Sequence, residues 1–203
     1  YSSFGQSKNP LVFCNGLGCS TFFWRHLHAA FKKKRQVVLF DWRGHGKSAA
    51  PKNSKNVSID CLCNDLNAVI KKLHIKRAIL AGHSMGVQTL YRYYEMYPKK
   101  VAALIPCFGT YERPLETFYN LSNAKYFFLL IYLFNHIFPR LAAAVSTLIA
   151  KNPFWFQMGS ALKMLNPGLA DKKVLRLYID HITGLNPVLF ADLMESIQDY
   201  SAR

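Results

Sequence analysis

The chain has 203 residues, of which 51% are apolar and 18% charged, so it is long enough for one domain with a hydrophobic core and is not a disordered chain. Its formal net charge of +15 favours contact with anionic surfaces, but the basic residues occur in short scattered groups at the ends of expected helices. A solvated surface is the favoured interpretation, with contact to nucleic acid or to lipid headgroups as the alternative. No nucleic-acid-binding motif is present, and we expect no nucleic-acid partner.

The five cysteines fit neither a CxxC pairing nor a zinc-ligand spacing. Cys14 and Cys107 lie in apolar runs, where a free cysteine packs as a small hydrophobic residue. This cysteine usage favours a reducing compartment, so we expect a cytoplasmic protein without a bound metal or cofactor.

Short apolar runs alternate with amphipathic segments over the first half of the chain. The expected strands are residues 11–14, 37–40, 78–81 and 101–105. Helices are expected over 21–31, after the N-cap residue Ser58, and over 87–97, where Pro98 ends the pattern. This alternation predicts an α/β fold with a mostly parallel sheet and helices on both of its faces.

After residue 110 the pattern becomes helical, and no later run resembles a buried strand that ends in a Gly-Asp or Gly-His turn. We therefore predict a partial sheet core over 1–110 and a helical lid over 111–203. Two apolar runs within the lid, 126–134 and 141–150, are separated by polar residues and Pro139. Because a membrane span needs about 20 consecutive, mainly apolar residues, two packed helices are favoured over a span.

The strongest functional signal is the Gly-His-Ser-Met-Gly sequence over residues 82–86. The motif alone is weak, but an apolar strand precedes it and an amphipathic helix follows, as in a nucleophile elbow. In that setting Ser84 lies on a strained turn with its hydroxyl exposed, and Gly82 and Gly86 let the strand and helix approach closely. An oxyanion hole would use the backbone amide of Met85 and a second amide from the turn after the first strand, supplied by Leu17.

The chain resembles the α/β-hydrolase superfamily, in its lidded branch of esterases and lipases. Three matches carry the resemblance: the Gly16-Leu17 turn, the Asp-x-Arg-Gly-His-Gly-x-Ser segment over 41–48, and the elbow at 82–86. The resemblance implies a carboxylic-ester hydrolase that forms an acyl-enzyme at Ser84, with the amides of Leu17 and Met85 as oxyanion hole. Asn15 departs from the family, which often has histidine there.

A serine nucleophile needs a histidine base oriented by an acid, and in this fold both follow the serine in the chain. No segment after residue 109 matches those positions, and the chain starts at Tyr1 without Met. We therefore expect an internal portion of a longer hydrolase, with the acid and base outside it. The alternative is Glu112 as the acid with His136 or His181 as the base.

His45 belongs to a structural turn, and His83 is a poor base because neighbours on a tight turn point apart. The apolar lid hints at an ester with a medium or long acyl chain, although those residues would equally pack the lid onto the sheet. Two further functions stay open: a non-catalytic ligand-binding protein, and a membrane-surface protein that uses the apolar lid together with the positive charge. The serine argues against the haloalkane and epoxide hydrolase branches, which use aspartate at that position.

Overall fold

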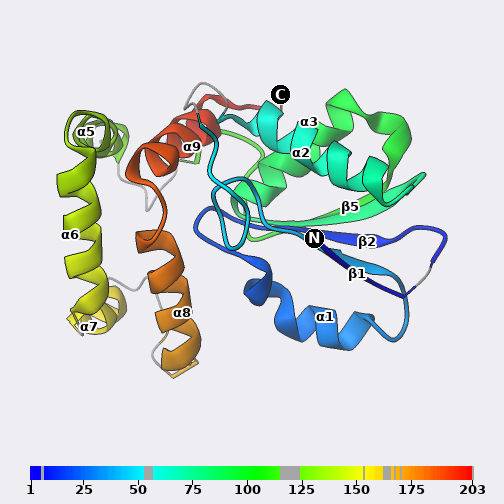
Figure 1. Ribbon diagram of the computed structural model, residues 1–203, viewed down its shortest axis with the longest axis horizontal. Helices are drawn as coiled ribbons and strands as arrows, with labels where there is room; N and C mark the ends of the chain where they lie inside the picture. Colours follow the sequence, from blue (N-terminus) through cyan, green and yellow to red (C-terminus); the bar gives the residue numbers. More distant parts are fainter. Residues whose placement is uncertain are drawn as a thin grey trace.

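The computed structural model describes residues 1–5, 7–52, 57–114, 124–152, 154–161, 166, 168–169 and 171–202 (Figure 1). Five strands form one sheet in the order β1-β3-β2-β4-β5. The strands are β1 (Ser2–Phe4), β2 (Leu11–Cys14), β3 (Val37–Leu39), β4 (Ala78–His83) and β5 (Val101–Cys107). Strands β2 to β5 are parallel, and β1, which the sequence did not predict, pairs antiparallel with β3 at one edge.

Both faces of the central strands are buried, which explains why these strands appear in the sequence as continuous apolar runs. Side chains alternate between the faces along each strand. In β2, Val12 and Cys14 belong to the larger core cluster, whereas Leu11 and Phe13 join a second cluster with Trp24. The predicted α/β class, with a mostly parallel sheet and helices on both faces, is confirmed.

Helices α2 (Ile59–Lys72) and α3 (Met85–Met96) cover one face of the sheet, and α1 (Arg25–Phe31) lies on the other (Figure 1). As predicted, Ser58 caps α2, because its hydroxyl accepts a hydrogen bond from the Cys61 amide at 3.2 Å. The predicted apolar stripe over 21–31 was partly wrong. The first turn is the 3-10 helix η1 (Thr21–Trp24), which buries Trp24, while α1 buries none of its residues.

A short 3-10 turn, η3 (Pro98–Lys100), joins α3 to β5, and helices follow β5 in the part of the chain that is described. They are α5 (Ala124–Ile137), α6 (Pro139–Lys151), α7 (Phe154–Ala161), α8 (Lys172–Thr183) and α9 (Pro187–Asp199). The two predicted apolar helices are confirmed as α5 and α6, which are bent by 117° relative to each other. Among the described residues no single helix is long and apolar enough to cross a membrane, and only this bent pair meets the criteria when taken together.

Helix α9 packs into the sheet domain although it lies within the predicted lid range. Leu189, Leu193 and Ile197 belong to the larger core cluster. The buried Gln88 of α3 also donates a hydrogen bond of 2.8 Å to the Ile197 carbonyl. The boundary at residue 110 stays a prediction, but α9 is anchored to the core on the side of α2 and α3.

Candidate functional site

Ser84 lies at the sharp turn between β4 and α3. Its φ of 53° is in the left-handed region, which costs a residue with a Cβ atom roughly 1–2 kcal/mol. The turn is held by hydrogen bonds, including one of 2.8 Å from the Val87 amide to the Ser84 carbonyl. The Ser84 side chain is exposed, and its hydroxyl forms no hydrogen bond with any residue that the structure describes. This is the strained, open turn that the motif predicts.

The two motif glycines allow a very close approach of backbone segments. A Cβ atom added at Gly82 would lie 2.6 Å from the backbone of Gly86. One added at Gly86 would overlap the carbonyl oxygen of Cys14 on β2. The predicted reason for both glycines is therefore confirmed.

The turn after β2 is fastened to the core by Asn15, the residue that departs from the family pattern. Its buried side chain donates to the Phe40 carbonyl at 2.8 Å and accepts from the Trp24 indole at 2.7 Å. Its own carbonyl accepts from the Trp42 indole at 2.8 Å. Three bonds thus fix the start of the turn, and Leu17 follows two residues later.

His45 also holds the turn after β2 in place. Its Nε2 accepts a hydrogen bond from the Gly18 amide at 3.2 Å, and its Nδ1 lies 3.1 Å from the Arg43 carbonyl. Burial of the ring lowers the pKa of His45, so the neutral form that accepts from Gly18 is favoured. These contacts agree with the predicted structural role.

A cavity of about 550 Å³ opens at Ser84. It is lined by the turn after β2, by η1 and α1, by the elbow, and by α8 with the residues just before it. The lining residues are Leu17, Cys19, Phe22, Phe23, Arg25, His26, His83, Ser84, Leu169, Asp171, Val174, Leu175 and Tyr178. The predicted Leu17 and Ser84 therefore lie in one cavity, while Met85, at the first position of α3, is buried directly behind it. The sequence prediction used only the backbone amides of Leu17 and Met85. It therefore did not indicate which other residues line the cavity.

His83 lines the same cavity as Ser84. That its side chain points apart from Ser84, which makes it a poor base, stays a prediction. The His83 ring lies 4.4 Å from the Phe23 ring, and burial lowers its pKa. Its Nδ1 is buried without a hydrogen-bond partner among the described residues, and no bond joins it to Ser84. His83 is therefore part of the cavity wall.

The alternative acid and base candidates are not brought together. His136 Nε2 pairs with Asp192 at 2.9 Å, and His181 Nε2 lies 3.4 Å from the Ser20 hydroxyl. Glu112 forms an isolated antiparallel bridge with Ser201. Within the described part of the chain, no hydrogen bond joins any of these three candidates to Ser84.

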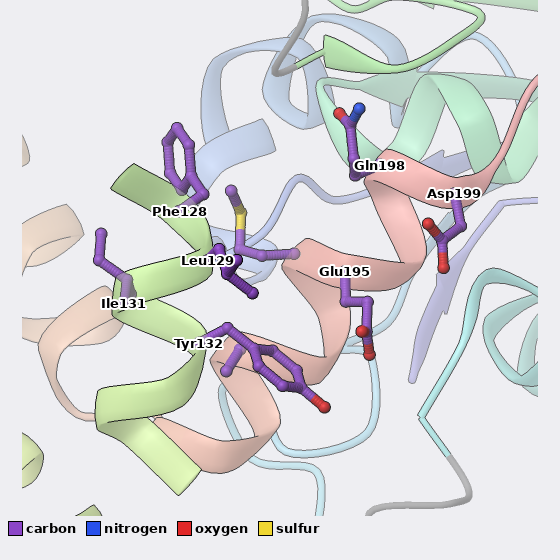
Figure 2. Close-up of a pocket in the computed structure, with 9 residues that line it drawn as sticks. Phe128, Leu129, Ile131, Tyr132, Glu195, Gln198 and Asp199 are labelled. Carbon is purple, nitrogen blue, oxygen red and sulfur yellow. The ribbon is translucent and has the colours of Figure 1, made fainter. Parts of the chain in front are cut away.

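A second, smaller cavity of about 140 Å³ lies between α5 and α9 (Figure 2). Figure 2 shows Phe128, Leu129, Ile131 and Tyr132 on α5 opposite Glu195, Gln198 and Asp199 on α9. None of the residues of the Ser84 cavity line it. We therefore treat the Ser84 cavity as the candidate active site.

Comparison with known proteins shows the fold family to which the chain belongs. Mouse epoxide hydrolase 4 is 30% identical over 106 residues, which are 52% of this chain and 30% of that protein. The 3-oxoadipate enol-lactonase 2 of Acinetobacter baylyi is 39% identical over 87 residues, 42% of this chain and 32% of that protein. The matches thus span about a third of the length of these curated relatives.

Among solved structures, an esterase from Exiguobacterium antarcticum superposes with a TM-score of 0.72 at 16% identity, covering 100% of this chain and 70% of that one. At this identity the likeness shows the fold alone. The sequence profile of the family described as alpha/beta hydrolase fold matches residues 9–136, well over half of the chain. The chain therefore belongs to the α/β-hydrolase fold family.

Proposed function

We propose that this chain forms the nucleophile-bearing part of a serine hydrolase that cleaves carboxylic esters, lactones included, through an acyl-enzyme at Ser84. The carrying observation is an exposed serine at positive φ, at the N-terminus of a helix and in an apolar-lined cavity. The Ser84 Oγ attacks the carbonyl carbon while its proton passes to a base. The ester C–O bond then breaks, the alcohol leaves with a proton, and water hydrolyses the acyl-enzyme to the free acid.

The charge that develops on the carbonyl oxygen would be held by two backbone amides. Met85 is the first residue of α3, so its amide has no acceptor within the helix and lies at the positive end of the helix dipole. Leu17 would supply the second amide from the turn that Asn15 and His45 hold in place. Each such donor is worth about 3 kcal/mol of transition-state stabilisation.

The proposal needs a general base, and we assign none of the well-anchored histidines to that role. His45 is engaged with Gly18, and His136 with Asp192. The base and its acid partner remain part of the proposal for the whole protein, as the sequence led us to expect.

An apolar acyl group fits the cavity best. Phe22, Phe23 and Val174 contribute to a largely apolar wall, and each CH₂ group buried there would gain about 0.8 kcal/mol. The names of related proteins include both epoxide hydrolases and an enol-lactonase. A serine at the elbow, where the epoxide hydrolase branch is expected to carry aspartate, favours the ester or lactone chemistry.

A series of p-nitrophenyl esters tests this proposal on the whole protein. We expect kcat/KM to rise from acetate to octanoate, and a Ser84→Ala variant to lose at least about 10³-fold in kcat. A Ser146→Ala variant on α6, outside the cavity, serves as the matched control and keeps full activity. Turnover that survives Ser84→Ala would refute the assignment of the nucleophile.

A further inference from the structure

Helix α6 turns its small residues toward the protein and its large apolar residues toward solvent. Ala142 and Ala150 are its buried residues. Leu141 and Leu148 are 53% and 70% exposed, and Val145 lies between them on the same face. A helix on the surface of a protein in water shows the opposite order, with large apolar side chains inward. The exposed face of α6 is therefore suited to an apolar environment.

Helix α5 also leaves large apolar residues exposed. Among its residues whose burial is described, the buried one is the polar Asn135, whose amide donates to the Ile131 carbonyl at 2.8 Å, and the neighbouring His136 pairs with Asp192 of α9. The exposed residues on α5 are large and apolar: Tyr126, Phe127, Leu129, Leu130, Leu133 and Ile137. The His136–Asp192 pair and apolar residues such as Phe128 and Ile131 thus face α9, and further large apolar side chains stay exposed.

We call the exposed apolar residues along these two consecutive helices the outer apolar face. It consists of the exposed residues Leu130, Leu133, Ile137, Phe138, Leu141, Val145, Leu148 and Ile149. Helices α5 and α6 are consecutive, with one residue between them, and lie on the side of α8 and α9 that is away from the sheet (Figure 1). So many exposed large apolar residues on neighbouring helices indicate an interaction site.

The charge around the outer apolar face indicates what covers it. From residue 117 to residue 170 the sequence has no acidic residue, and its four basic residues include Arg140 and Lys151. Both of these are exposed, one in the first turn of α6 and one in the last. Large apolar side chains between two cations, on helices that carry no acidic residue of their own, match the acyl chains and phosphates of an anionic lipid surface.

We propose that the outer apolar face inserts shallowly into a bilayer that contains anionic phospholipids. Helix α6 has 13 residues and is about 20 Å long, too short to span the hydrocarbon core, so it lies along the interface. The face is separate from the Ser84 cavity, so this proposal stands or falls independently of the proposed hydrolase activity.

Sedimentation with sucrose-loaded vesicles tests the proposal on the purified protein. Vesicles of phosphatidylcholine alone are compared with vesicles that contain about 30% phosphatidylglycerol. We expect the protein to bind the anionic vesicles. The partition coefficient of Leu148→Ser should be about tenfold lower, because this variant lacks one Leu side chain that would become buried in the bilayer. Arg140→Gln is expected to lower the partition coefficient about fivefold, because this variant lacks one cation near the lipid headgroups.

Leu27→Ser is the matched control, because Leu27 is also exposed but lies on α1, which α8 separates from α6 (Figure 1). It should leave partitioning unchanged, and circular dichroism should show that all variants are folded. The proposal is overturned if the protein stays in solution with both vesicle types, or if Leu27→Ser weakens binding as much as Leu148→Ser. It is equally overturned if light scattering shows a dimer that Leu148→Ser dissociates, since a second copy would then cover the face.

Discussion

Replacing Asn15 with alanine tests how much the hydrogen bonds of this side chain stabilise the fold. The substitution removes one donor and one acceptor from a site that is completely buried. The Phe40 carbonyl and the Trp24 indole N–H would both lose their partners. An unsatisfied buried polar group costs about 1–3 kcal/mol, so we expect Asn15→Ala to lower the free energy of unfolding by about 4 kcal/mol.

Urea denaturation measures this change directly. With a slope of about 2 kcal/mol per molar urea for a domain of this size, the unfolding midpoint should fall by about 2 M. Asn67→Ala is the matched control, because Asn67 is also buried but accepts only one bond, of 3.3 Å, from the Tyr93 hydroxyl. It should cost about 1 kcal/mol. Equal effects of the two substitutions would refute the account of the Asn15 network.

Three further predictions follow from the site and its surroundings. Gly86→Ala should destabilise the fold by about 3 kcal/mol in the same urea assay, since the added methyl group overlaps the backbone of Cys14. Burial lowers the pKa of His45, so below about pH 6.5 the unfolded chain binds more protons than the folded chain, and the free energy of unfolding should fall on acidification by up to about 1.4 kcal/mol per pH unit. Urea denaturation at about pH 7.5 and about pH 5.5 measures this change. His45→Gln should reduce the dependence of the unfolding free energy on pH. Iodoacetamide at about pH 8 should alkylate the partly exposed Cys61 and Cys107 of the folded protein before the three buried cysteines. Peptide mass mapping measures the order of alkylation.

Each of these predictions has a contradicting outcome. An unfolding midpoint of Gly86→Ala equal to that of the parent chain would mean that helix α3 and strand β2 can separate at no cost. A pH slope unchanged in His45→Gln would assign the titration to another group, of which His83 is the nearest, because burial lowers its pKa as well. Early alkylation of Cys19, whose pKa burial raises to about 12, would mean that the wall of the Ser84 cavity is open.

The sequence was sufficient for the parts of the fold in which local pattern and tertiary environment agree. Strands β2 to β4 are apolar at nearly every position because both faces of the sheet are covered there, and the elbow follows from the chemistry of two glycines. Strand β5 is apolar as well, although Val101 is its one buried residue. The strand β1 was missed because Ser2–Phe4 has no distinctive pattern and owes its conformation to pairing with β3.

The cavity wall could not be predicted, because its residues come together only in the tertiary structure. Tyr178 and Leu175 of α8 line the same cavity as Ser84 although they follow it by about 90 positions in the chain, and no spacing in the sequence encodes that placement. The position of α9 depends on tertiary structure for a similar reason: a helical pattern does not say whether Leu193 packs on a lid or on the core.

The central claim, that Ser84 is an activated nucleophile, is tested most directly by labelling the whole protein with a fluorophosphonate probe and mapping the adduct by peptide mass spectrometry. The account predicts a single adduct on the peptide that contains Ser84, absent in Ser84→Ala and retained in Ser146→Ala. A folded protein that takes up no probe, or takes it up equally well without Ser84, would contradict the account.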